Sequence, residues 1–268
     1  MMAQSIFQNP PDSCRGTDFW MLNDRLDDNE LVRQLEEMHA QGVASVIART
    51  YIGLKSDYPG PDWMQKMHVV VDAAKRLGMT IFMQAGYMPE AVLDLPPEYV
   101  LKMVRAFPAG QGEGERLCTH SGLDYCLISS QNILDMLDPD ASKFYVLQSY
   151  ERMWAEFRSE FGKTITSVWV DEPSYGRADL PWTHGLPDAY RAIWGEEFPI
   201  DRVYLLFEDG DGAARLRYRY WRTVLHLITS SYFQSVRDWC NKNGVMFSGH
   251  LMGEDTMELQ MRTTCFTM

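Results

Sequence analysis

The sequence predicts an α/β fold of the (β/α)8-barrel type, and three observations carry that prediction. An amphipathic helix, a glycine and a short apolar strand follow one another four times along the 268-residue chain; such alternation produces βα units and a parallel sheet. The strands are continuous apolar runs, as expected when both faces of a sheet are covered. Long loops rich in proline, glycine and aromatic residues follow at 86–98, 107–123 and 173–212, where such folds place their chemistry.

The series begins with a predicted strand at 18–22 and a helix in LDDNELVRQLEEMHAQG. Asp27 or Asp28 can cap this helix, because a side-chain oxygen there accepts a hydrogen bond from a free backbone N–H. Leucines and a methionine recur at helical spacing and form its apolar stripe. Gly42 suits its C-terminal end, ahead of the strand VASVIART.

Three further passages of the same kind complete the series. The second helix starts near Pro61 and is followed by Gly78 and the strand MTIFMQAG. The third starts near Pro139 and is followed by Gly162 and ITSVWVDE. The fourth covers about 213–243 and is followed by Gly244 and VMFSGHLMGE.

A closed barrel is favoured over an open doubly wound sheet. A dinucleotide-binding sheet carries GxGxxG directly after its first strand, whereas the nearest match, GQGEG at 110–114, falls in a polar stretch. A full barrel takes about 250 residues, yet only about five of eight βα units are recognisable, and the chain stops at MRTTCFTM. The prediction is therefore an incomplete barrel, with an N-terminal extension at 1–17 and a catalytic barrel domain at 18–268 whose C-terminal part is missing.

The composition limits the classes of binding partner and the cellular location that we expect. The net charge of −12 disfavours nucleic acids and anionic membranes, both of which require a basic surface. No segment has the roughly 18 consecutive apolar residues of a membrane span, and the N-terminus lacks the basic and apolar regions of a signal peptide. Five cysteines without a CxxC pair indicate free thiols in a reducing compartment. We therefore expect a cytoplasmic location.

Two adjacent acids follow the apolar run in SVWVDEPSYG, at the predicted end of a barrel strand. Pro173 disfavours a helical conformation at Glu172 and is expected to keep that residue extended. Strand alternation places Asp171 and Glu172 on opposite sides of the backbone, so one can enter the cleft while the other binds a neighbouring group. Asp171 is counted among the candidate substrate-binding residues. The competing interpretation is a solvated turn acid or helix cap.

The next predicted strand also ends in polar groups, in SGHLMGED, which contains His250 and Glu254. Glu172 and Glu254 would then be acids on adjacent strands facing one cleft. Glycoside hydrolysis requires two such carboxylates, one to protonate the leaving oxygen and one to activate water or attack. Their separation, which the sequence does not supply, decides between inversion and retention.

Aromatic and histidine residues support a sugar ligand. Rings in the strand-end loops can stack on pyranose faces, and the candidates are Tyr87, Tyr175, Trp182 and Tyr190. The competing interpretation is that most of the aromatic residues form the core. His250, directly after a strand, is placed to line the site. No HxH or HExxH pair occurs, so no metal site is predicted.

Four segments, in this order, resemble the catalytic barrel of bacterial glycoside hydrolases related to the family 106 α-L-rhamnosidases: DFWMLNDRLDDNELVRQLEEMHAQGVASVIARTYIGLKSDY, AAKRLGMTIFM, VWVDEPSY and SGHLMGED. The resemblance runs from about residue 18 to the end of the chain. It implies a (β/α)8 barrel with Glu172 as general acid and Glu254 as its partner carboxylate. Asn23, Asp24, Arg25 and Arg49 would shape the sugar subsite. No cofactor is expected; the resemblance makes calcium a candidate, because some relatives bind it, but no ligands can be assigned in this sequence.

Two other functions are compatible with the sequence. An incomplete barrel could bind carbohydrate without turning it over, and its exposed strand edges predict self-association. A sugar-phosphate isomerase or aldolase is less favoured, because no predicted strand end carries a lysine for a Schiff base.

Overall fold

The computed structural model describes residues 6–84, 95–173 and 180–250. They fall into two compact units. Of the described residues, the parallel unit comprises 6–84, 149–171 and 238–250, and the antiparallel unit comprises 95–148, 172–173 and 180–237.

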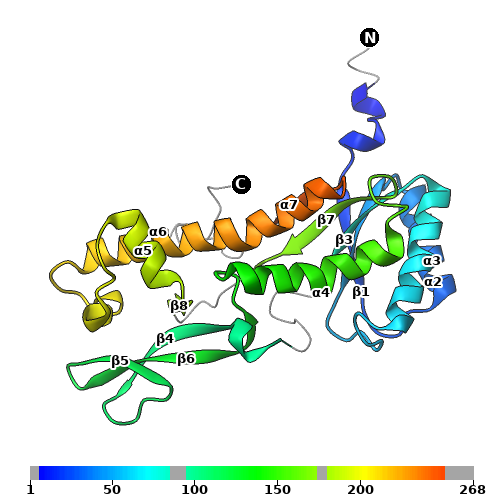
Figure 1. Ribbon diagram of the computed structural model, residues 1–268. Coiled ribbons are helices and arrows are strands. Elements are labelled where there is room, and N and C mark those ends of the chain that lie inside the picture. Colours follow the sequence, from blue (N-terminus) through cyan, green and yellow to red (C-terminus); the bar gives the residue numbers. More distant parts are fainter. Residues whose placement is uncertain (1–5, 85–94, 174–179, 251–268) are drawn as a thin grey trace. The chain divides into compact units, whose positions relative to one another are not determined.

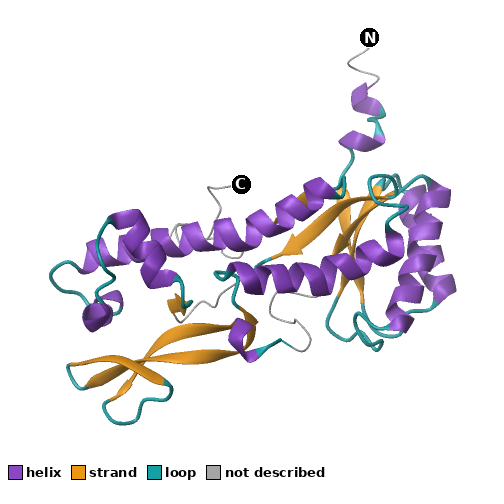
Figure 2. Ribbon diagram, viewed as in Figure 1, coloured by secondary structure: helices purple, strands orange, loops and turns teal. Residues whose placement is uncertain are grey.

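Five parallel strands form the sheet of the parallel unit (Figures 1 and 2), which confirms the five strands predicted from the sequence. Every neighbouring pair is parallel, and the order in the sheet follows the order in the chain. In that order the strands are β1 (Thr17–Leu22), β2 (Ser45–Thr50), β3 (Thr80–Gln84), β7 (Ile165–Asp171) and β9 (Met246–His250). The described residues leave this sheet open, with β1 and β9 as its edges.

The helices predicted between the strands are also present. They are α2 (Asp28–Ala40), α3 (Pro61–Leu77), α4 (Pro139–Phe157), α6 (Ala213–Ile228) and α7 (Gln234–Lys242). The fourth predicted helix is interrupted, because a π-helical turn, η5 (Thr229–Phe233), lies between α6 and α7. Gly78 ends α3 with a left-handed φ of 72°, a conformation that glycine adopts without a steric penalty.

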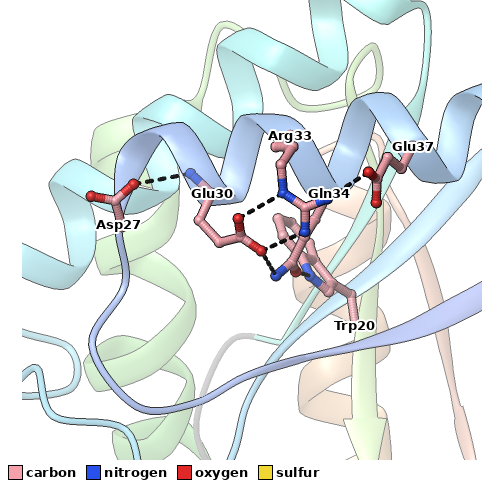
Figure 3. A network of polar contacts seen from close by, with 6 residues as sticks. All are labelled: Trp20, Asp27, Glu30, Arg33, Gln34 and Glu37. Atoms are coloured by element: carbon pink, nitrogen blue, oxygen red, sulfur yellow. Dashed lines mark hydrogen bonds and ion pairs between the residues drawn. The ribbon is translucent and has the colours of Figure 1, made fainter.

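A polar network fixes α2 to β1 (Figure 3). Asp27, and not Asp28, caps the helix by accepting a hydrogen bond of 3.0 Å from the Glu30 N–H. The Glu30 carboxylate accepts from Arg33 and from Gln34 Nε2, each at 2.7 Å. Gln34 Oε1 accepts in turn from the indole of Trp20 at 2.7 Å. The network therefore satisfies the one polar atom of a buried β1 tryptophan.

One face of the parallel sheet is apolar and buried, and it supplies much of this unit's core. Its residues alternate along the strands: Trp20, Leu22, Val46, Ala48, Ile81, Met83, Val168 and Val170. Apolar residues of α2 and α3 are buried as well, and they lie on one stripe of each helix: Leu31, Leu35, Met67, Val70, Val71 and Ala74. The two-residue alternation leaves the opposite face of the sheet for other contacts.

The antiparallel unit contains a second sheet that the sequence did not predict. Its order is β5 (Glu115–His120), β6 (Leu123–Leu134), β4 (Val100–Pro108) and β8 (Leu180–Trp182), with antiparallel neighbours throughout. The prediction of long loops at 107–123 and 173–212 was therefore wrong. These stretches also hold α5 (Leu186–Trp194) and η4 (Ile200–Leu206). GQGEG lies between β4 and β5.

No helix in the described ranges is both long and apolar enough to cross a membrane. Cys14, Cys118, Cys126 and Cys240 are free thiols, and Cys265 lies outside the described residues.

A buried carboxyl marks the junction between β6 and α4 in the antiparallel unit. Asp135 is 4% exposed, and its Oδ1 accepts a hydrogen bond of 3.1 Å from the Leu137 N–H. Burial raises the pKa of the Asp135 carboxyl to about 7, and the neighbouring Asp138 carboxylate acts in the same direction. The folded protein therefore holds a proton that the unfolded chain, with its pKa near 4, releases.

Because the folded protein binds this proton and the unfolded chain does not, we expect the free energy of unfolding to fall as the pH rises. The contribution of Asp135 is fully present below about pH 4 and is lost through pH 7, a change of up to about 4 kcal/mol in the free energy of unfolding. Asp135→Asn should be more stable than the parent at pH 8 and close to it at pH 4. Denaturant unfolding at both pH values measures this, with the exposed Asp140→Asn as control. Equal pH dependence in parent and Asp135→Asn would contradict the assignment.

Candidate functional site

The second face of the parallel sheet, which we call the inner face, combines aromatic, polar and charged residues. The strand register and two-residue alternation assign its members. They are Phe19, Met21, Ile47, Arg49, Phe82, Gln84, Ser167, Trp169, Asp171, Ser248 and His250. The polar members gather toward the carboxyl ends of the strands, the edge at which parallel α/β folds place their chemistry.

The sheet curls around its inner face. In a flat sheet β1 and β7 would be about 14 Å apart, and β1 and β9 about 19 Å, at roughly 4.8 Å per strand. The ring centroids of Phe19 on β1 and Trp169 on β7 are nevertheless 5.2 Å apart. Those of Phe19 and His250, on the two edge strands, are 6.3 Å apart. The inner face is therefore concave, as in a segment of a barrel wall.

A buried carboxylate lies at the centre of this face. Asp171 ends β7, and its side chain is only 2% exposed. Its Oδ2 forms an ion pair with Nη2 of Arg49, which reaches from β2 across β3. Its Oδ1 accepts a hydrogen bond of 2.8 Å from Nε2 of His250 on β9. We call these three residues the Asp171 clasp. It connects the ends of β2, β7 and β9.

Aromatic rings surround the clasp. The Arg49 guanidinium lies over the rings of Phe19 and Tyr51, 5.8 and 5.2 Å from their centroids, a cation–π arrangement. The ring of Trp169 is 5.6 Å from that of His250. Phe19 is 42% and Tyr51 38% exposed, so both present ring surface to solvent. Among the described residues, Nε of Arg49 and Nε1 of Trp169 are buried donors without a hydrogen-bond acceptor.

Close backbone packing holds β9 against β7 beside the clasp. Gly249 pairs with Val170, and a Cβ atom on Gly249 would lie 2.2 Å from the Val170 carbonyl oxygen. Only glycine permits this approach. Nearby, the buried Ser167 hydroxyl donates to the Met246 carbonyl at 3.1 Å. His250 therefore reaches Asp171 from a strand that cannot be displaced without breaking the pairing.

The loop after β1 carries three predicted subsite residues, Asn23, Asp24 and Arg25, and all three are exposed. Asp24 has a left-handed φ of 58°. Its N–H donates to the Gly53 carbonyl at 3.0 Å, and its own carbonyl accepts from the Lys55 N–H at 2.9 Å. The loops after β1 and β2 are thus hydrogen-bonded to each other at the carboxyl edge of the sheet.

The backbone of Glu172 differs from the prediction. Pro173 was expected to keep it extended, but its φ is +41°, in the left-handed region that residues other than glycine rarely adopt. The chain therefore turns sharply as it leaves β7. Residues other than glycine in this region are enriched at functional sites and in tight turns.

Other predicted residues have different positions from those expected. Asp171 is too deeply buried to contact a substrate directly, because its carboxylate is covered by its two partners. Trp182 lies in the core of the antiparallel unit, 4% exposed, with its ring 5.2 Å from that of Phe198. Tyr190 is buried in the same core. Tyr87, Tyr175 and Glu254 lie outside the described residues.

The sequence did not predict the two aromatic residues beside the clasp, Phe19 and Trp169. Trp169 stands in an apolar run, and Phe19 in the predicted strand at 18–22. Counting back two residues from Asp171 places Trp169 on the face of the carboxylate, so alternation could have identified it. In the ranges that the structure describes, no group of three or more His, Cys, Asp or Glu side chains could hold a metal ion.

Comparison with solved structures shows the fold. The chain matches a rhamnosidase from Novosphingobium sp. PP1Y with a TM-score of 0.66 and 11% identity, over 93% of this chain and 47% of that one. It matches a β-galactosidase from the Antarctic haloarchaeon Halorubrum lacusprofundi with a TM-score of 0.51 and 12% identity, over 89% and 37%. The chain thus shares its fold with glycoside hydrolases. It spans about half the length of the rhamnosidase and a smaller share of the β-galactosidase. No protein-family model and no curated protein sequence matches it.

The Gly249 contact predicts a specific loss of stability. In Gly249→Ala the new methyl group must push β9 away from β7, which should lower the free energy of unfolding by about 1–3 kcal/mol. Gly185→Ala is the control, because its φ is −78° and a Cβ there meets nothing within 4 Å. Denaturant unfolding measures both variants. Equal stability of the two would show that β9 is not held in this register.

Proposed function

We propose that this chain belongs to a glycoside hydrolase that cleaves a glycosidic bond by paired-carboxylate chemistry, in the manner of an α-L-rhamnosidase. In this proposal the five parallel strands are part of a (β/α)8 barrel related to the family 106 enzymes. Its partner is a carbohydrate substrate, and no organic cofactor takes part; calcium, for which no ligands are assigned, remains a candidate.

The observation that supports the proposal most is that two adjacent strands of a concave sheet end in polar residues and lead into the candidate acids. β7 ends in Asp171 and passes directly into Glu172, while the neighbouring β9 ends in His250, four residues before Glu254. Two solved structures with a similar fold, a rhamnosidase and a β-galactosidase, are glycosidases by their names. Exposed rings of Phe19 and Tyr51 on the same side of the sheet offer the flat apolar surface on which a sugar ring can stack.

Each carboxyl has one role in this scheme. Glu172, as general acid, protonates the glycosidic oxygen as the bond to the anomeric carbon breaks. Glu254, as the partner, either removes a proton from an attacking water molecule or attacks the anomeric carbon itself. Arg49, His250 and the loop residues Asn23, Asp24 and Arg25 would bind hydroxyl groups of the sugar. The left-handed backbone at Glu172 turns the chain where the acid is required.

Glu172→Gln tests the proton-donor role. The amide cannot donate an acidic proton, so kcat should fall by about 10²–10⁴-fold on an aryl glycoside with a poorly activated leaving group. The loss should be far smaller on an activated leaving group such as a nitrophenolate, which departs without protonation. Steady-state kinetics of the full-length protein on both substrates measures this.

The exposed Glu197→Gln, whose parent side chain is 74% exposed, serves as the control. Unchanged turnover of the poorly activated substrate by Glu172→Gln would eliminate Glu172 as the acid.

A second candidate is a carbohydrate-binding protein without turnover. It is favoured by one observation, that the described strands form an open sheet of five and no closed barrel. Calorimetry with a panel of monosaccharides and disaccharides, beside the activity assay, separates the two functions. Binding without hydrolysis of any matching glycoside would select the binding protein.

A further inference from the structure

We propose that Asp171 is a positioning residue, whose buried carboxylate fixes the end of β7 from which the catalytic carboxylate Glu172 is presented. This inference rests on the proposed glycosidase function and adds a role that contact with substrate does not explain. It replaces the direct substrate contact that the sequence suggested for Asp171.

The burial of Asp171 requires both of its partners. A carboxylate that is 2% exposed has lost most of its hydration, which costs several kcal/mol unless opposite charge and hydrogen bonds replace it. Arg49 supplies the charge from β2, and His250 supplies a hydrogen-bond donor from β9. The two donors approach different oxygens, so the carboxylate can satisfy both only with both strands in their present register.

The position of the clasp in the chain gives it a consequence for catalysis. Asp171 immediately precedes Glu172, and His250 is the last residue of β9. One hydrogen bond of 2.8 Å therefore connects the residue before the proposed acid to the neighbouring strand. Because β7 and β9 are paired, a shift of either strand end would move the backbone that carries Glu172.

The surrounding contacts make the clasp rigid. Gly249 and Val170 pack backbone to backbone, one residue before His250 and Asp171 respectively. Phe19 and Tyr51 cover the Arg49 guanidinium, which restricts its rotation. A group held on all sides is suited to fix its neighbours and poorly suited to follow a substrate through a reaction.

Asp171→Asn is the direct test. An amide carries no negative charge to balance Arg49, and with its oxygen on Arg49 it turns its NH2 group toward His250 Nε2, a nitrogen that donates to the carboxylate in the parent protein. We expect kcat on a poorly activated aryl glycoside to fall by about 100-fold, the cost of a displacement of about 1 Å, with KM changed by less than about threefold. On an activated aglycone the loss should be clearly smaller, because displacement of the acid matters most where protonation is needed.

This dependence on the leaving group separates positioning from a merely structural role. Loss of folded protein lowers both rates by the same factor, whereas a displaced acid does not. Asp188→Asn, which removes an exposed carboxylate paired with Arg191, is the matched control and should leave both rates unchanged. His250→Leu removes the donor and so breaks the clasp from the β9 side, and it should show the same dependence; it carries the test if Asp171→Asn does not fold.

The comparison with Glu172→Gln distinguishes two kinds of failure. If Glu172→Gln shows the leaving-group effect but Asp171→Asn and His250→Leu lose both rates equally or not at all, the positioning role is overturned and the proposed function stands. If Glu172→Gln shows no such effect, the proposed function and the inference fall together.

Discussion

The Asp171 carboxylate, shared between Arg49 and His250, is the interaction on which the carboxyl edge of the parallel sheet depends. Removal of either partner would leave a charge or a donor buried without compensation, a change that commonly costs 3–5 kcal/mol for an ion pair. The two partners come from strands on opposite sides of β7, with β3 between Arg49 and the carboxylate. Three strand ends are consequently held as one piece, and the chain leaves β7 and β9 from fixed points.

The curvature of the sheet follows from the same set of residues. Phe19 on one edge strand meets Trp169 and His250 on strands that a flat sheet would place far away. Aromatic contacts and the Arg49–Asp171 pair therefore fill the concave side, while aliphatic residues fill the helix-covered side. This division of the two faces gives the unit a buried core on one side and a partly exposed polar and aromatic surface on the other. Such a surface suits a sugar, which has both hydroxyl groups and an apolar ring face.

The sequence was sufficient for the elements of the parallel unit because their signals are local. Apolar periodicity, the Asp27 cap and the glycine after α3 identified five strands and the helices between them. The antiparallel sheet was missed, since its strands pair across hairpins rich in glycine and polar residues that resemble loops. Trp182 was misplaced because a short strand beside an aromatic core has the same composition as a strand-end loop. The clasp itself depends on contacts between residues 49, 171 and 250, and no local pattern contains that information.

The left-handed backbone of Glu172 belongs to the same class of tertiary effects. Local rules place a residue before proline in an extended conformation, yet the surrounding structure imposes φ = +41°. The proposed function turns on whether this residue and Glu254 face each other. A crystal structure of the full-length protein would give the distance between their carboxyl groups. We predict about 5–5.5 Å for a retaining or 6.5–9.5 Å for an inverting enzyme; a separation well beyond roughly 10 Å would contradict paired-carboxylate catalysis by these two residues.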